Sequence, residues 1–192
     1  DMLAVDHPMS AELRNAVAEQ LLEALRVGER RVRLAVYNTR VFSLPEVRPA
    51  LRRQTAEILI AQLHVTDHPD VLDRIGGMIE VLGEPALDPL VQALRESRPG
   101  PVADRVVRVL GRTAAALLRS GRKVPRGPAI VKYLRKHVAD PGVQEGGYAL
   151  ALAAVAAAGI ESAQDACQDA DLLLERLRRG PARVEFLEGL GW

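Results

Sequence analysis

Apolar residues recur along this chain at spacings of three and four, which is the period of one face of an α-helix. The clearest stripe follows Ser10 and consists of Leu13, Val17, Leu21, Leu22 and Leu25. Ser10 is a favoured N-cap residue, and Gly28 is a favoured residue just beyond a helix end. We therefore expect the first helix between these two positions.

The same period predicts a series of helices separated by short breaks that carry proline or glycine. They cover about residues 10–27, 31–42, 45–63, 70–82, 84–94, 102–110, 113–119, 129–139, 143–158, 162–179 and 182–190. Short breaks place consecutive helices antiparallel and side by side. Period-2 runs of β-branched and aromatic residues, which indicate strands, are missing from the sequence. The fold class expected is all-α.

Composition agrees with this expectation and limits the function classes. Hydrophobic residues make up 48% of the 192 residues and aromatic residues only 3%, so the core is expected to be aliphatic. The formal net charge of +1 produces no global field that favours nucleic acid or a membrane surface. Only Lys123, Lys132 and Lys136 are lysines among 26 cations, and this bias towards arginine indicates a GC-rich bacterial genome.

The sequence also bears on the compartment. A single cysteine, Cys167, excludes an internal disulfide and a cysteine-rich zinc site, and it fits a reducing compartment. The apolar run 148–160 is shorter than the ~20 residues that span a bilayer. No basic segment followed by an apolar one marks a signal peptide at the N-terminus. We expect a cytoplasmic protein with no membrane partner.

Two sets of similar segments within the sequence indicate internal repeats. Residues 81–83, 109–111 and 157–159 each end a predicted helix in Gly, and the first two glycines lie 28 residues apart. Residues 64–67 resemble 137–140, and both are followed by a proline, a valine and a glycine pair. A single helical hairpin cannot bury its apolar face, whereas stacked hairpins form a continuous core.

This pattern resembles the HEAT repeats, in particular the short bacterial type also found in bilin lyases. Residues 82–94 look like the first helix of such a repeat and 102–111 like the second, and the resemblance covers about 58–159. It implies an α-solenoid of stacked antiparallel helical hairpins, a HEAT-like superhelix. In this interpretation residues 1–63 form N-terminal helices, as a cap or as irregular repeats, and 64–192 form the repeats with C-terminal capping helices.

Candidate catalytic groups are weak. His64 and His68 have the i, i+4 spacing of two metal ligands on one helix face, but they flank a predicted turn beside Pro69, where Asp67 and Asp70 suit helix caps. Acidic neighbours disfavour a reactive thiolate at Cys167. The glycine pairs lack the Lys-Ser/Thr of a phosphate loop, and no nucleophile elbow occurs. We expect no enzyme activity, no cofactor and no metal.

Charge placement is more informative. Residues 105–139 contain cations but no Asp or Glu, and we call this segment the basic stretch. The residues predicted to contact a partner are Arg105, Arg108, Arg119, Lys132, Arg135 and Lys136 on the row of second helices, together with Arg122, Lys123 and Arg126 of the loop between them. The competing interpretation is that these arginines cover apolar surface and pair with acids of the neighbouring repeat.

Four functions remain open at this stage. The first is a non-enzymatic scaffold that binds a protein partner, favoured to be acidic, on the helical-repeat surface. The second is DNA or RNA binding through phosphate contacts, although only Tyr133 lies near the basic stretch to stack on bases. The third, a lyase-like accessory protein, follows only from the family resemblance. The fourth is self-association through open ends of the stack.

Overall fold

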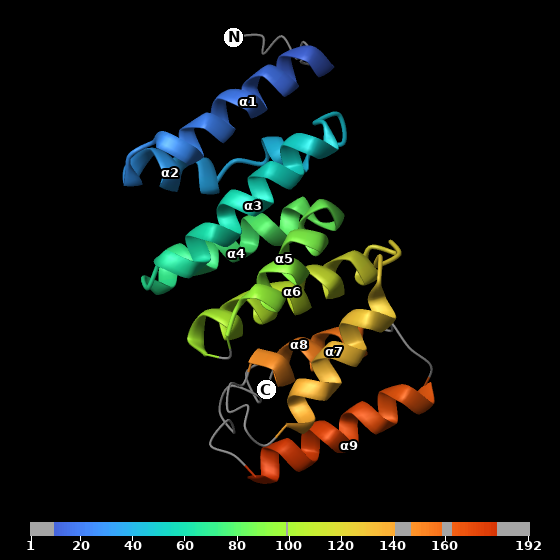
Figure 1. Cartoon of the computed structure of the whole chain (residues 1–192). Helices are drawn as coiled ribbons and strands as arrows, with labels where there is room; N and C mark the ends of the chain where they lie inside the picture. The colour runs from blue at the N-terminus through green and yellow to red at the C-terminus, as the bar shows by residue number, and fades with distance from the viewer. Residues whose placement is uncertain (1–9, 99, 141–146, 159–162, 180–192) are drawn as a thin grey trace, which may run out of the picture.

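The computed structural model describes residues 10–98, 100–140, 147–158 and 163–179 (Figure 1). Within these ranges the regular elements are helices and no strand occurs, which confirms the all-α prediction for this part of the chain. None of the helices described is both long enough and apolar enough to cross a membrane.

Nine α-helices and one 3₁₀ turn make up the described part of the chain. They are α1 (Ala11–Val27), α2 (Arg30–Tyr37), η1 (Val41–Ser43), α3 (Pro49–Val65), α4 (Pro69–Leu82), α5 (Glu84–Glu96), α6 (Pro101–Arg119), α7 (Gly127–Ala139), α8 (Gly147–Ala157) and α9 (Ala163–Arg179). Ser10 caps α1 by accepting a hydrogen bond from the backbone N–H of Leu13, and proline occupies the first turn of α3 to α7. Proline suits that position because the first-turn N–H groups have no partner inside the helix.

The helices follow one another along the long axis of the molecule (Figure 1). Consecutive helices pack as pairs, among them α1 with α2, α3 with α4, α5 with α6 and α7 with α8. Most helices also pack against the next but one: α1 with α3, α2 with α4, α3 with α5, α4 with α6, α6 with α8 and α7 with α9. Odd-numbered and even-numbered helices therefore form two rows, and the odd row is loosest between α5 and α7.

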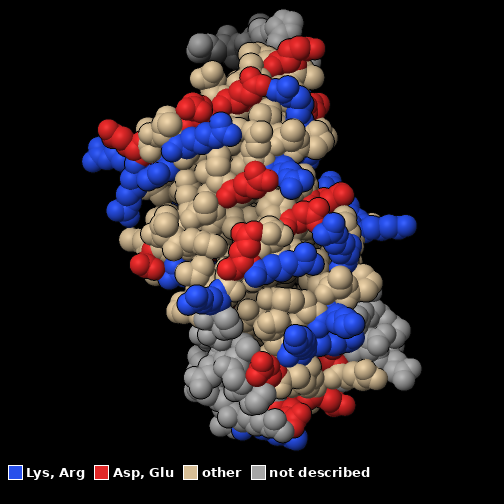
Figure 2. Space-filling model, in the orientation of Figure 1, with Lys and Arg blue, Asp and Glu red and all other residues tan. Residues whose placement is uncertain are grey.

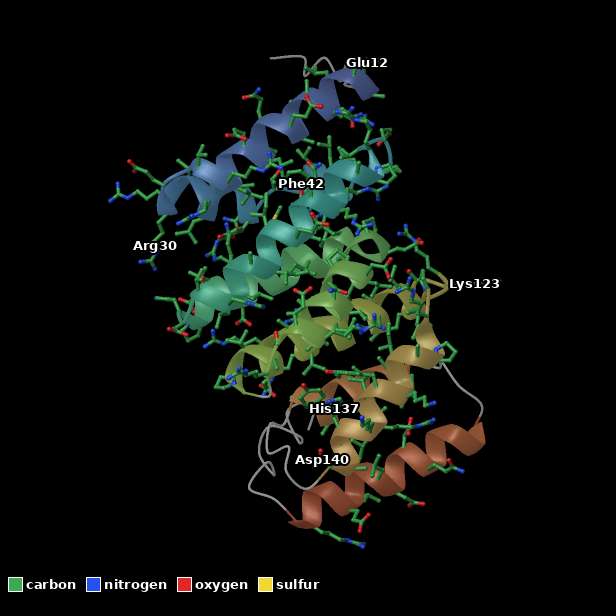
Figure 3. The ribbon with its side chains drawn as sticks, viewed as in Figure 1. Glu12, Arg30, Phe42, Lys123, His137 and Asp140 are labelled. Atoms are coloured by element: carbon green, nitrogen blue, oxygen red, sulfur yellow. The ribbon has the colours of Figure 1, made fainter. Side chains whose placement is uncertain are left out.

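One aliphatic core connects these helices. Its fully buried side chains come from successive helices and include Leu25, Leu59, Leu63, Ile75, Ile79, Leu90, Leu110, Leu134 and Leu152. The largest is Phe42 in η1, which is 1% exposed (Figure 3). Residue 63, where the sequence pattern suggested the start of the repeats, lies near the end of α3 and within this shared core.

Gly111 corrects the sequence interpretation. Residues 102–110 and 113–119 were predicted as two helices separated at Gly111, but they form the single helix α6. A Cβ atom on Gly111 would lie only 2.4 Å from the Cα of Ala151 in α8, so this glycine permits close packing and does not end a helix. Gly83 does end α4, with φ of 69°. The 28-residue spacing of these glycines is therefore not a repeat of helix ends, and Gly159 lies outside the described residues.

Other boundaries differ by less. The second helix ends at Tyr37 and not near 42, because the N–H of Asn38 donates to the carbonyl of Ala35 and that of Thr39 to the carbonyl of Val36. The third helix begins at Pro49. The predicted helix 182–190, the predicted turn at 141–142 and residues 143–146 of the predicted helix 143–158 lie outside the described residues.

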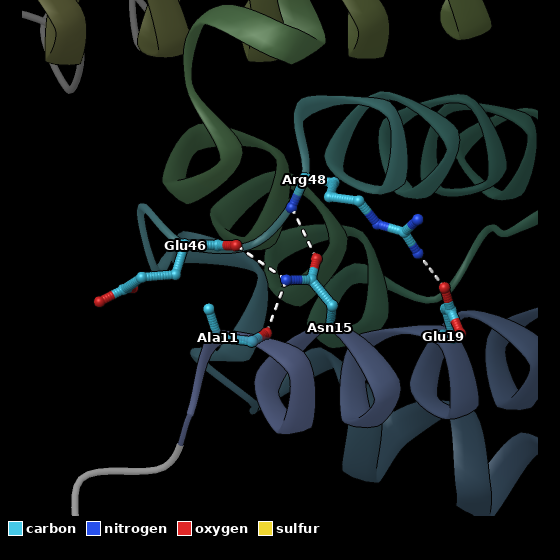
Figure 4. Close-up of polar contacts among 5 residues, drawn as sticks. All are labelled: Ala11, Asn15, Glu19, Glu46 and Arg48. Atoms are coloured by element: carbon cyan, nitrogen blue, oxygen red, sulfur yellow. Dashed lines mark hydrogen bonds and ion pairs between the residues drawn. The ribbon is translucent and has the colours of Figure 1, made fainter.

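Asn15 joins α1 to the segment that enters α3 (Figure 4). Its side-chain NH₂ donates to the carbonyl oxygens of Ala11 (2.7 Å) and Glu46 (2.9 Å), and its Oδ1 accepts from the backbone N–H of Arg48 (2.9 Å). Arg48 also forms an ion pair with Glu19 of α1. One amide thus fixes the first hairpin against the rest of the stack.

Replacing Asn15 with alanine should lower the free energy of unfolding by about 1 to 2 kcal/mol, because two backbone groups lose their inter-element partner. Urea denaturation followed by circular dichroism measures the loss. Gln20→Ala is the matched control, since Gln20 is exposed on the same helix. Equal midpoints for the two variants would show that the amide does not hold α1 in place.

Candidate partner-binding surface

The basic stretch is divided between the two rows of helices. Arg105, Arg108 and Arg119 lie on α6 in the even row, whereas Lys132, Arg135 and Lys136 lie on α7 in the odd row. Arg122, Lys123 and Arg126 occupy the connection between them, where Lys123 lies at the edge of the molecule (Figure 3). The row of second helices expected from the sequence therefore does not carry all of these residues.

Arg105 stabilises the turn between α3 and α4. Its guanidinium donates to the carbonyl oxygens of Leu63 (3.3 Å) and Thr66 (2.6 Å) and to Oδ1 of Asp67 (2.8 Å). Asp67 therefore pairs with α6 and does not cap α4, whose N-cap residue is His68. Arg105 ties one hairpin to the next through contacts within the chain.

Asp104 plays a similar part at the junction of α6 and α8. It accepts from Nε of Arg108 (2.8 Å) and from the backbone N–H of Gly147 (2.5 Å). The donor from Gly147 is one of the first-turn N–H groups that α8 cannot satisfy internally. A Cβ on Gly147 would fall 2.3 Å from Oδ1 of Asp104, so glycine is needed at this position.

Arg135 forms an ion pair with Asp169 of α9, and the two side chains are 29% and 3% exposed. Arg119 donates to the carbonyl oxygen of Ala115 in its own helix. Five cations of the basic stretch are exposed and lack an ion-pair partner in the described part of the chain: Arg119, Arg122, Lys123, Lys132 and Lys136.

Charges of both signs are interleaved on the face drawn in Figure 2. Basic and acidic side chains lie next to one another over α1 to α5 instead of forming a large patch of one sign. The ion pair Arg112–Glu80 (3.0 Å) joins α6 to α4, and Arg126–Asp88 (3.3 Å) joins the α6–α7 connection to α5. This arrangement is the one described by the competing interpretation of the basic stretch.

Three aromatic rings gather between α7 and α8. His137 stacks on Tyr148 with centroids 4.9 Å apart, and Tyr133 lies 4.2 Å from His137 and 6.3 Å from Tyr148. Only Tyr133 was expected near the basic stretch. Tyr148 is 2% exposed, so the cluster fills the space between helices and offers no open platform for nucleic-acid bases.

The structure reveals a groove that sequence reasoning missed. A pocket of about 660 Å³ lies between α3, α5 and the α6–α7 connection, and it includes Arg52, Arg53, Asp88 and Arg122. A second pocket, of about 620 Å³, continues along α3 and α5 and shares Arg53 and Asp88 with the first. A third, of about 130 Å³, lies between α5, α6 and α7 and shares Arg126 with the second.

We call these three pockets, which share lining side chains, the α3–α5–α7 groove. Prolines from three turns, Pro45, Pro49, Pro85 and Pro125, line its first pocket. Proline fixes φ and has no N–H, so these walls are rigid and offer carbonyl oxygens and apolar rings to a bound segment.

The arginines of the groove differ in whether their guanidinium groups have an ion-pair or hydrogen-bond partner. Arg53 pairs with Glu57 (3.1 Å) and Arg126 with Asp88 (3.3 Å), both at exposed positions. Nε of Arg52, in contrast, is buried without a hydrogen-bond partner. Arg126 is also the one non-glycine residue of the described ranges with a positive φ, 59°. Such backbone strain often accompanies binding sites.

The histidine pair is separated by a helix boundary. His64 lies in the last turn of α3, and His68 precedes the first residue of α4. No group of three or more His, Cys, Asp or Glu side chains suited to a metal ion occurs among the described residues. Cys167 lies in α9, and its side chain is outside the described part.

Comparisons with known proteins add no family: no family model matches the chain, and searches of curated proteins and of solved structures find no similar protein. The geometry defines the class of protein, an all-helical stack. The resemblance to HEAT repeats stays a proposal.

Proposed function

We propose that this chain is a non-enzymatic interaction scaffold, a HEAT-like α-solenoid that binds a protein partner along the α3–α5–α7 groove. The groove includes Arg122 and Arg126 of the basic stretch. It replaces the row of second helices as the favoured surface.

The packing of the helices supports the solenoid. Hairpins α3–α4, α5–α6 and α7–α8 stack so that each helix packs against its chain neighbour and mostly against the next helix in its row. The two segments that resemble a HEAT repeat are α5 and α6, and they pack together as one hairpin. Proteins of this architecture use their extended surfaces to hold partners.

The observation that carries the proposed binding site is the continuity of the groove. Small-molecule sites are mostly apolar and bury most of their ligand. Here the two larger pockets are lined by charged side chains and prolines, and they run side by side along α3 and α5. A surface of this length and mixed character suits a polypeptide segment.

The same residues favour protein over nucleic acid. Glu57, Asp88 and Glu96 line the second pocket, and their carboxylates would repel phosphates. Arg105 and Arg135 of the basic stretch are engaged in ion pairs within the chain. Phosphate binding requires several cations free to neutralise the backbone.

A charge-reversed groove tests this proposal. Arg53→Glu with Arg122→Glu should reduce capture of the specific partner from a lysate of the source organism about tenfold or more, because two cations of the groove become repulsive. Quantitative mass spectrometry of the bound proteins measures the change. The matched control, Arg30→Glu with Arg31→Glu, makes the same charge change at exposed positions of α2. Equal capture by both variants would remove the groove as the binding surface.

A further inference from the structure

We infer that the partner segment carries a leucine-sized aliphatic side chain flanked by carboxylates, the aliphatic group filling the α5–α6–α7 pocket and the carboxylates binding the arginines of the groove. This inference rests on the proposed function and specifies the chemistry of the same site.

The smallest pocket of the groove has the size and lining for one aliphatic side chain. It measures about 130 Å³ and is lined by Val91, Leu94, Leu110, Ala129, Ile130 and Tyr133, with Arg95 and Arg126. Apolar cavities of roughly 150 Å³ remain dry and hold a benzene-sized group. Its lining comes from α5, α6 and α7 together with Arg126, which also lines the second pocket.

Two arginines, Arg95 and Arg126, contribute to the lining of this apolar pocket. Arg95 is exposed in the last turn of α5 and has no ion-pair partner among the described side chains. Arg126 pairs with Asp88 at 3.3 Å, but the two side chains are 60% and 55% exposed. Exposed pairs of this kind contribute little stability, so a carboxylate of the partner can replace Asp88 at low cost. An acidic residue beside the aliphatic one is thereby favoured.

The first pocket of the groove is lined by more cations than acids: Arg52, Arg53 and Arg122 against Glu84 and Asp88. Nε of Arg52 is buried without a hydrogen-bond partner, and Arg122 in the same pocket has no ion-pair partner in the described ranges. Of the two acids in this pocket, Asp88 already pairs with Arg126, and Glu84 lies in the first turn of α5, where the helix dipole stabilises it. The remaining imbalance is positive, and a carboxylate is the planar acceptor that a guanidinium binds in bidentate fashion.

The pockets are close enough for a single segment. The first and second share Arg53 and Asp88, and the second and third share Arg126. A segment that lies across the three pockets would place its aliphatic residue in the third and its carboxylates towards the arginines of the first. The middle pocket, with charges of both signs, accommodates polar residues between them.

Peptide selection tests this chemistry. Random linear peptides displayed on phage are selected on the immobilised full chain and sequenced. We expect enrichment of peptides with one Leu, Ile or Met and at least two Asp or Glu nearby. An enriched peptide, synthesised with a fluorophore, should bind Ala129→Phe at least about tenfold more weakly than wild type, because the new ring fills the pocket. Fluorescence anisotropy measures the affinity.

Ala139→Phe is the matched control, since Ala129 and Ala139 are both exposed positions of α7 and only Ala129 lines the pocket. It should bind as wild type does. Enrichment of basic or purely polar peptides, equal binding to Ala129→Phe and wild type, or no enrichment would each overturn the inference. If the charge-reversed groove still loses its partner in the lysate experiment, the scaffold proposal stands and only this chemistry fails.

Discussion

Replacing Gly111 with alanine is expected to lower the free energy of unfolding by about 3 kcal/mol, although alanine is the better helix former. The added methyl group would lie 2.4 Å from the Cα and 2.6 Å from the Cβ of Ala151. The backbone of Ala151 cannot rotate away from the added methyl group as a flexible side chain could, so α6 and α8 must separate. Their interface is the most extensive between any two helices of the described part, and its loss affects the whole lower half of the stack.

Gly77→Ala provides the matched control for this prediction. Gly77 lies inside α4, and nothing lies within 4 Å of the position of an added Cβ. There the substitution should raise stability by about 0.5 to 1 kcal/mol, the ordinary preference for alanine in a helix. Urea midpoints of the two variants should therefore move in opposite directions. A stabilised Gly111→Ala protein would show that α6 and α8 do not approach this closely.

Replacing Arg135 with methionine should cost about 3 kcal/mol, because it leaves the carboxylate of Asp169 buried without its cation. Asp169 is 2% exposed as a residue and accepts from Nε of Arg135 across the contact between α7 and α9. Methionine retains much of the aliphatic stem, so the change chiefly removes the charge. Thermal and urea denaturation both report the loss.

Lys136→Met separates this effect from a general loss of positive charge. Lys136 is the next residue, exposed and without an ion pair in the described part, and its replacement should leave the urea midpoint unchanged. Adding Asp169→Leu to Arg135→Met should restore stability to within about 1 kcal/mol, because an apolar pair replaces the unpaired charge. If Arg135→Met is no less stable than Lys136→Met, Arg135 is free to serve a partner, as the sequence suggested.

Local signals were sufficient to predict most of the helices. Ser10, Gly28, Pro49 and Pro69 act through the few backbone groups at a helix terminus, so their effect does not depend on distant residues. The break at Gly111 was predicted wrongly because Gly111 acts through α8, which begins 36 residues later in the chain. A glycine that ends a helix and a glycine that admits a neighbour look the same in the sequence.

The pairing of the basic stretch was not predictable for a similar reason. The competing interpretation expected acids of the neighbouring repeat without naming them; Asp67, Glu80 and Asp88 come from preceding segments and Asp169 from a later helix. The packing of the helices brings these acids next to the arginines of the basic stretch. Sequence proximity thus says little about charge balance in a fold where each helix is covered by the next but one.

The groove was missed because three separate segments form it. In the sequence, Arg52 and Arg53 indicate only the polar face of one helix. Pro85 and Pro125 indicate only breaks between helices. Only their common position beside Arg122 turns them into a lined pocket. Two arginines next to each other on a helix that begins with proline were the signal present, but nothing in the linear pattern indicated what lies opposite.

The two-row packing has a consequence for how the chain acquires its structure. Each helix that packs substantially does so with partners no more than three helices away in sequence, as α3 does with α6. Contacts of such short range favour rapid folding. The first hairpins can therefore assemble while later ones are still being synthesised on the ribosome, and each emerging pair finds its docking face already formed.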